Sequence, residues 1–170
     1  MPRRSTYPSR LRAFEVKEII AVGRRDAIGD CPNGSYDTYL PSRQLDQRVG
    51  QADVVFLCCS QSAENLGLVN EDFIACLKRG CLLVNIARGG LLDYPAVEAA
   101  LLDGRLGGLG MDVYRNEPFT FEDSIFRLPN VVATPHVAGV TEVSYRTQAK
   151  ILCDNILRVR DGLPPLGCVH

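Results

Sequence analysis

Short apolar runs alternate with helical patterns along this chain, and the alternation predicts an α/β fold. Five runs are continuously apolar, so we expect strands buried on both faces at EIIAVG (18–23), DVVFLC (53–58), CLLVNIA (81–87), LGGLGMDV (106–113) and NVVATP (130–135). Helices are predicted at 41–49, 71–79, 95–104 and about 140–160. Asn70 is the expected N-cap of the second helix, Pro95 stands in the first turn of the third, and Asp161-Gly162 ends the fourth. Strands that alternate with helices favour right-handed crossovers and a parallel sheet.

Polar side chains follow three of the predicted strands. Arg88 comes after the strand 81–87, Asp112 closes the strand 106–113, and His136 follows the strand 130–135. Glu117 lies five residues beyond Asp112 in the same loop. Because ligands of parallel α/β sheets bind outside the carboxyl ends of the strands, the sequence predicts a site at this rim.

Each of these residues, taken alone, also fits a structural role. A strand-end arginine is commonly solvated, Asp112 fits a turn cap, and a single histidine commonly packs with one backbone hydrogen bond. His136 and His170 are the two histidines of the chain. The order and spacing of the whole set favour a site over three separate structural roles.

Composition narrows the class of protein. The chain has 170 residues, of which 46% are hydrophobic and 23% charged, with a formal net charge of -1. These values suit one globular domain and argue against a nucleic-acid-binding face, and no apolar run approaches the roughly 20 residues that span a bilayer. Seven cysteines without a C-x-x-C spacing favour free thiols and a reducing, cytoplasmic location. The first fourteen residues carry four arginines and no acid, which leaves a plastid or another organelle as an alternative.

Four longer motifs resemble one family, the D-isomer-specific 2-hydroxyacid dehydrogenases. They are ADVVFLCC (52–59), LGLVNEDFIACLKRGCLLVNIARGGLLD (66–93), LLDGRLGGLGMDVYRNEP (101–118) and NVVATPHVAG (130–139), in the family's order and at its separations. The resemblance runs from about Arg10 to the end of the chain. It implies a Rossmann-type, doubly wound parallel sheet that binds NAD or NADP, and a homodimer.

The resemblance also implies roles for individual residues. Arg88 matches the arginine that holds the carboxylate of a 2-oxo acid, His136 the general acid/base, and Glu117 the partner of that histidine. Asp112 matches the carboxylate that binds the nicotinamide amide, and Gly89-Gly90 are expected to let the backbone approach cofactor and substrate. Cofactor contacts are expected at Arg24, Arg25, Cys59, Ser60, Ile86, Ala87, Arg88, Asp112, His136 and Gly139. No metal is implied.

The chain departs from the family pattern at three places. It has no G-x-G-x-x-G, so the domain is expected to lack its first strand and glycine-rich loop, and RLRAFEVKEIIAVGRR resembles the passage from the first helix into the second strand. After that strand stand Gly23-Arg24-Arg25 instead of an acidic residue, which slightly favours NADP, although Asp26 is compatible with NAD. Cys59-Ser60 replace the Thr-Pro of many members.

We therefore expect an NAD(P)-dependent oxidoreductase that acts on small 2-hydroxy acids, reducing 2-oxo acids such as glyoxylate or hydroxypyruvate. The alternatives are an enzyme similar to D-3-phosphoglycerate dehydrogenases and a non-catalytic, corepressor-like interaction protein. The expected organisation is a tail at 1–9, a partial NAD(P)-binding domain at 10–160 and a tail at 161–170. The chain is expected to be a truncated form, inactive by itself, because the missing strand is central in the family order 3-2-1-4-5-6.

Overall fold

The computed structural model describes residues 10–24, 34–118, 120 and 123–167. The chain divides into two compact units. The first unit extends to Pro135, and the second begins at His136.

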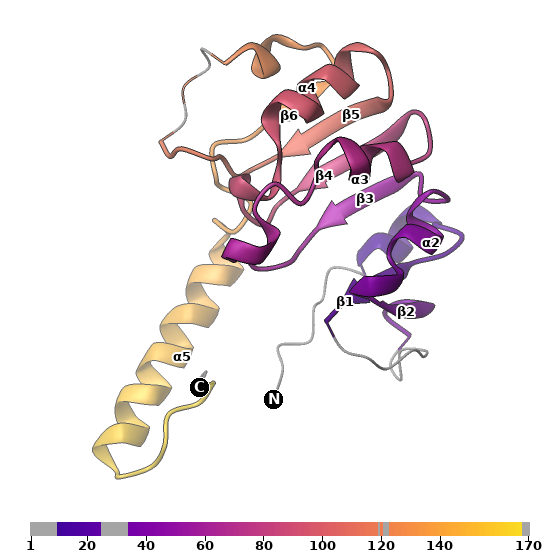
Figure 1. The fold of residues 1–170 in the computed structure, drawn as a ribbon. Helices are drawn as coiled ribbons and strands as arrows, with labels where there is room; N and C mark the ends of the chain where they lie inside the picture. The colour runs from indigo at the N-terminus through magenta and orange to yellow at the C-terminus, as the bar shows by residue number, and fades with distance from the viewer. Residues whose placement is uncertain (1–9, 25–33, 119, 121–122, 168–170) are drawn as a thin grey trace. The chain divides into compact units, whose positions relative to one another are not determined.

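All strand pairs of the described residues are parallel, and they form two sheets (Figure 1). One sheet contains β1 (Ile20–Gly23) and β2 (Thr38–Pro41). The other has the order β3-β4-β5-β6, with β3 at Val54–Leu57, β4 at Cys81–Asn85, β5 at Leu106–Met111 and β6 at Val131–Ala133. The predicted parallel α/β architecture is thereby confirmed. The separation of β1-β2 from the other strands agrees with the strand order expected from the resemblance.

Two helices of the first unit begin at side-chain caps. In α3 (Glu71–Cys76) the Asn70 side chain accepts the Phe73 N–H at 2.9 Å, which confirms the predicted cap. In α4 (Tyr94–Leu102) the Asp93 side chain accepts from Ala96, and a proline occupies the first turn as expected. Short 3-10 turns lie at Arg12–Phe14, Ser42–Gln44, Ala63–Asn65, Gly89–Leu91 and Ser124–Arg127.

The segment 38–49 differs from the sequence prediction. A helix was predicted over 41–49, whereas the chain forms β2, then a 3-10 turn, and only then the four-residue helix α2 (Asp46–Val49). β2 has four residues and ends at Pro41, so its apolar run is too short to stand out from its flanks. Pro41 cannot donate to a strand ladder and marks the end of the strand rather than the first turn of a helix.

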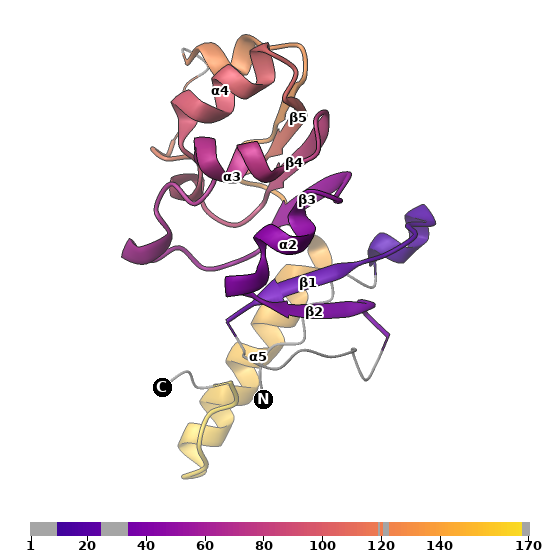
Figure 2. The same ribbon diagram turned by 45° about the vertical axis from the view of Figure 1, so that its right-hand side comes forward.

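The four-stranded sheet is covered on one face by α3 and α4, which lie on the same side of it (Figure 2). Leu83, Leu109 and Met111 point to that face and are nearly inaccessible to solvent. On the opposite face, Val54 and Phe56 are each 40% exposed, Leu82 is 45% exposed and Val132 is 69% exposed. The expectation of strands buried on both faces is therefore wrong for this sheet, because α3 and α4 lie on one face and apolar side chains of the other face are exposed.

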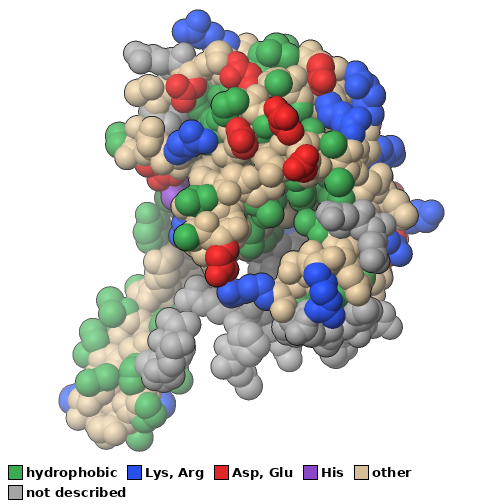
Figure 3. Space-filling model, viewed as in Figure 1, with side chains coloured by type: hydrophobic (Ala, Val, Ile, Leu, Met, Phe, Trp, Pro, Cys, Tyr) green, Lys and Arg blue, Asp and Glu red, His purple; other side chains and the backbone are tan. Residues whose placement is uncertain are grey.

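The second unit is built on the long helix α5 (Glu142–Arg160). Thr141 caps its start by accepting the Ser144 N–H, and Gly162, with φ of +72°, follows its end as predicted. The tail after Gly162 folds back along the helix, because Asn155 exchanges two hydrogen bonds with the backbone of Leu166. Apolar side chains are visible along α5 in Figure 3, and none of its residues is buried. Among the described residues, no helix has both the length and the apolar character needed to cross a membrane.

Candidate functional site

The loop that carries Arg88 is shaped by a buried asparagine. Asn85 ends β4 and is inaccessible to solvent. Its side-chain oxygen accepts the Ala87 N–H at 3.1 Å, and its side-chain nitrogen donates to the Arg88 carbonyl at 2.9 Å. Because a buried amide is costly unless it is satisfied, these bonds fix the turn. Arg88 is consequently held at the end of β4 with its side chain exposed. Asn85 was not among the residues predicted from the sequence.

Gly89 has a structural requirement that differs from the predicted one. A Cβ at this position would lie 1.9 Å from the carbonyl carbon of Tyr114 and 2.3 Å from the Arg115 nitrogen. The close approach that demands glycine is therefore to the protein's own backbone after β5. At Gly90, in contrast, a Cβ would meet only the Gln61 side chain.

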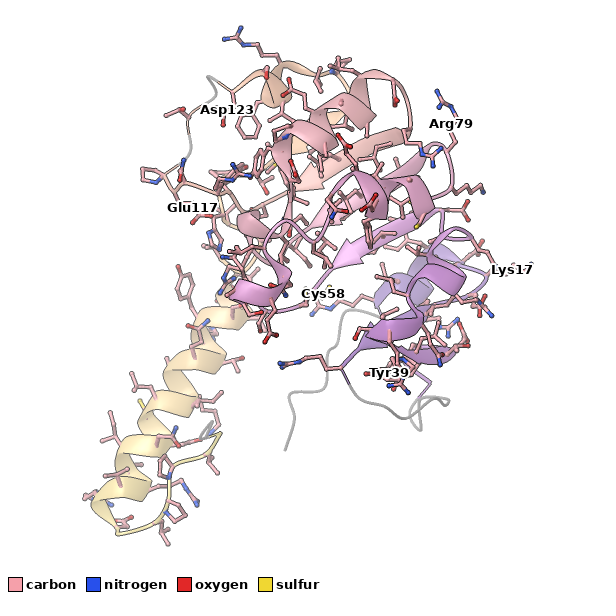
Figure 4. The ribbon with its side chains drawn as sticks, in the orientation of Figure 1. Lys17, Tyr39, Cys58, Arg79, Glu117 and Asp123 are labelled. Carbon is pink, nitrogen blue, oxygen red and sulfur yellow. The ribbon has the colours of Figure 1, made fainter. Side chains whose placement is uncertain are left out.

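A pocket of about 460 Å³ lies at the carboxyl ends of β3 and β4, as the sequence predicted for a ligand site. It is lined by Cys58, Cys59, Ser60, Gln61, Ile86, Ala87 and Arg88. Five of these seven residues were predicted to contact the cofactor, and Cys58 and Gln61 were not. Figure 4 shows Cys58 just beyond the end of β3. The volume is within the range of small-molecule sites, roughly 300–1,000 Å³.

The turn that forms one wall of the pocket is held by Asn65. Its side-chain oxygen accepts the Ser62 N–H at 2.7 Å, and its nitrogen donates to the Ser60 carbonyl at 2.8 Å. The same nitrogen lies 3.9 Å from the Cys59 sulfur, as a weak donor. Cys58 is exposed at the surface, but partial desolvation of its thiol, followed by the neighbouring Cys59, raises the pKa of Cys58 above the usual cysteine value. Cys58 is therefore protonated at neutral pH.

Asp112 lies beyond β5 and is only 4% exposed. Its backbone N–H donates to the Asn85 carbonyl at 3.1 Å, which ties it to the Arg88 loop. Its carboxylate accepts a short hydrogen bond from the Thr134 hydroxyl. The Tyr114 hydroxyl donates to the Thr134 carbonyl at 2.6 Å, and burial, with Asp112 as the next cause, raises the pKa of Tyr114 to about 12. The ends of β5 and β6 are thus joined by the hydrogen bonds that Thr134 makes with Asp112 and Tyr114.

Three further predicted site residues, Glu117, His136 and Gly139, are described in their own surroundings. Glu117 accepts the Tyr114 N–H at 3.0 Å and so closes its own loop. His136 and Gly139 belong to the second unit, where His136 is exposed with a φ of 55°. The pairing of Glu117 with His136 stays a prediction. Arg24 is exposed directly after β1, and Arg25 lies outside the described residues.

Comparison with known protein families identifies the family to which the chain belongs. Residues 6–138 match the NAD binding domain of the D-isomer specific 2-hydroxyacid dehydrogenases. The chain belongs to this family. A nicotinamide dinucleotide is therefore the cofactor class of the domain.

Relatives of known name support the assignment. The chain is 33% identical over 124 residues to a glyoxylate reductase of Pyrococcus furiosus. The aligned region covers 72% of this chain and 37% of the relative. It is 32% identical over 162 residues to a glyoxylate/hydroxypyruvate reductase B of Yersinia enterocolitica, with coverages of 89% and 50%. It is also similar, at 25% identity and a TM-score of 0.81, to the crystal structure of an NADPH-dependent glyoxylate/hydroxypyruvate reductase from Sinorhizobium meliloti in complex with NADP and sulfate, with coverages of 96% and 51%. The chain thus spans about half or less of these proteins.

Proposed function

We propose that this chain forms the nicotinamide-binding side of an oxidoreductase that interconverts small 2-hydroxy acids and 2-oxo acids, with glyoxylate or hydroxypyruvate as the substrate class. The observation that carries the proposal is the position of Arg88. A chain of an NAD-binding family holds an exposed guanidinium in a pocket at the carboxyl ends of β3 and β4. The names of the Pyrococcus and Yersinia relatives support the substrate class.

In this proposal the cofactor supplies the hydride, and side chains of the chain bind the substrate, transfer the proton and orient the nicotinamide. Arg88 binds the substrate carboxylate through its planar fork of donors, which fixes the orientation of the neighbouring carbonyl. His136 gives a proton to the carbonyl oxygen during reduction and takes it back during oxidation. Glu117 favours the protonated imidazole. The Thr134 hydroxyl holds the Asp112 carboxylate in place, so that Asp112 can accept from the nicotinamide amide.

We also propose that NADPH is preferred over NADH. Arg24 is exposed directly after β1, and Arg25 follows it in the sequence. Two guanidinium groups after this strand suit a 2'-phosphate, which accepts bidentate hydrogen bonds. The complex of the Sinorhizobium meliloti relative with NADP is compatible with this preference.

The test is reductase activity of the protein that contains this sequence, followed through NADPH consumption with glyoxylate and hydroxypyruvate. His136→Ala should lower turnover by roughly 10²-fold or more, the usual contribution of a general acid. Arg88→Gln should raise the KM of the 2-oxo acid. The matched control is Arg79→Gln, because Arg79 precedes β4 and donates to the Asp103 carbonyl, away from the pocket (Figure 4).

Two results would contradict the proposal. Near-normal turnover of His136→Ala would remove the assigned proton donor. An equal loss in Arg79→Gln and Arg88→Gln would show that charge, and not carboxylate binding, explains the effect. For the cofactor, replacing Arg24 and Arg25 with alanine should weaken NADPH far more than NADH, and equal use of both cofactors by the unmodified protein would refute the preference.

A further inference from the structure

Two adjacent thiols line the pocket that contains Arg88. Cys58 and Cys59 are both free and exposed, and both contribute to the pocket wall. Neighbouring residues of an extended strand point to opposite faces. However, β3 ends at Leu57 and the chain bends at Cys59, so the two residues face one pocket. The other described cysteines, Cys76, Cys81 and Cys153, do not line it.

We propose that Cys58 and Cys59 form a dithiol site for a monosubstituted trivalent arsenical, a thiophilic group that bonds both sulfurs, and that its occupation closes the pocket to ligands of Arg88. This site is separate from the proposed reaction, since neither thiol has a role in hydride or proton transfer. It adds a ligand class to a pocket that the family resemblance assigns only to cofactor and substrate.

Geometry favours a bridging atom over a direct disulfide. Consecutive Cα atoms are about 3.8 Å apart across a trans peptide. Disulfides usually require a Cα separation of roughly 4.4–6.8 Å, so a bond between adjacent cysteines is strained. An arsenic atom between the two sulfurs enlarges the ring and removes that restriction.

The number of available sulfur ligands also favours a monosubstituted arsenic atom over a zinc ion. A structural zinc ion takes about four protein ligands, and no group of three or more metal-ligating His, Cys, Asp or Glu side chains is present in the described part of the chain. An arsenic atom that already bears one carbon needs two sulfurs and nothing more. Two thiols on one wall match that requirement.

The surroundings of the pair hold one sulfur in place. The Asn65 side chain, itself fixed by Ser62 and Ser60, lies 3.9 Å from the Cys59 sulfur. Cys59 is thereby positioned before any ligand arrives. Its neighbour Cys58 lines the same pocket, directly after the end of β3.

The reaction balances without an oxidant. With phenylarsine oxide, the two S–H bonds and the arsenic–oxygen bonds break, two As–S bonds form, and the oxygen departs as water with both thiol protons. Arsenic stays trivalent and sulfur keeps its oxidation state. The phenyl group then occupies the pocket of about 460 Å³ that the thiols share with Arg88.

The experiment uses the 170-residue chain with phenylarsine oxide in the presence of excess 2-mercaptoethanol, and intact mass spectrometry as readout. The unmodified chain should retain one phenylarsenic group, which 2,3-dimercaptopropanol removes. Cys58→Ser or Cys59→Ser should weaken retention by roughly 10²-fold, because the second bond is then no longer intramolecular. Cys153→Ser, at an exposed cysteine on α5, is the matched control and should retain the group.

A second readout tests the pocket rather than the thiols alone, since adjacent thiols also react in an unfolded peptide. Phenylglyoxal modification of arginines, mapped by peptide mass spectrometry, should be lost at Arg88 after arsenical binding and unchanged at Arg79. Retention of the group by the double serine variant, loss of two hydrogens as a disulfide, or failure of the unmodified chain to retain the group would each overturn the proposal. So would equal reactivity of Arg88 before and after binding. Neither readout requires cofactor or turnover, so an inactive protein leaves the test valid.

Discussion

Substitution of Gly89 by alanine should destabilise the first unit far more than substitution of its neighbour Gly90. The added Cβ at position 89 would lie 1.9 Å from the Tyr114 carbonyl carbon, whereas ordinary contacts begin at 3.4 Å. Both atoms belong to, or are attached directly to, backbone, so no side-chain rotation relieves the clash. The Arg88 loop has to move away from the segment after β5.

The free-energy cost of Gly89→Ala follows from the packing that this movement disturbs. Overpacking costs about 1–3 kcal/mol, and Leu91 and Leu92, which follow directly and are inaccessible to solvent, lose part of a burial that contributes about 1.5–3 kcal/mol each. We expect Gly89→Ala to lower the free energy of unfolding by about 3 kcal/mol or more. At Gly90 the added Cβ meets the flexible, exposed Gln61 side chain, so Gly90→Ala should cost less than about 1 kcal/mol.

Urea unfolding followed by far-ultraviolet circular dichroism measures the difference. With a slope of about 1–3 kcal/mol/M, the midpoint of Gly89→Ala should fall by roughly 1–3 M or the transition should disappear, and Gly90→Ala should unfold close to the unmodified chain. Similar midpoints for the two variants would refute the reasoning, because it rests entirely on the difference between a backbone neighbour and a side-chain neighbour.

Two further predictions concern single side chains. A spectrophotometric titration should show a tyrosine that ionises near pH 12 and is absent from Tyr114→Phe, since burial and Asp112 raise the pKa of Tyr114 to about 12. Because Tyr114 of the unfolded chain loses its proton first, near pH 10, the free energy of unfolding should fall as the pH rises from about 10 to 12. An unchanged titration in the variant would contradict the assignment. Asn70→Ala should lower the free energy of unfolding by about 1 kcal/mol, measured by the same urea midpoints, because the Phe73 N–H loses its acceptor, whereas Asn70→Asp should retain most of the stability.

The helix boundaries show which parts of the fold the sequence determines locally. Asn70 and Asp161-Gly162 mark helix ends through their own side-chain and backbone preferences, and both lie where the structure has an end. The failure at 38–49 has the opposite cause. β2 exists because its backbone pairs with β1, from Ile20–Thr38 to Gly23–Pro41, and such a partner is not visible in a four-residue window.

Burial was the weakest part of the sequence prediction, for a reason that extends beyond this chain. A continuously apolar sequence indicates that both faces of a strand can be buried, but it does not indicate which face another element covers. Phe56 and Leu82 are as apolar as Leu57 and Leu83, yet the first pair is 40% and 45% exposed and the second is almost inaccessible. Which face is covered depends on α3 and α4 and on segments outside the strands.

The site residues also differ in whether a local sequence pattern or a partner elsewhere determines their role. Arg88 was predictable because a cation after a buried strand, followed by two glycines, is a local pattern that also matches the family. Asn85 was not, because an asparagine inside an apolar run gives no sign of its partners, and its role depends on hydrogen bonds to Ala87 and Arg88 in the turn that follows. The same holds for Gly89, whose neighbour Tyr114 is distant in sequence. Family motifs thus identify the groups that meet a ligand, while the groups that hold them in place are found by following each buried polar atom to its partner.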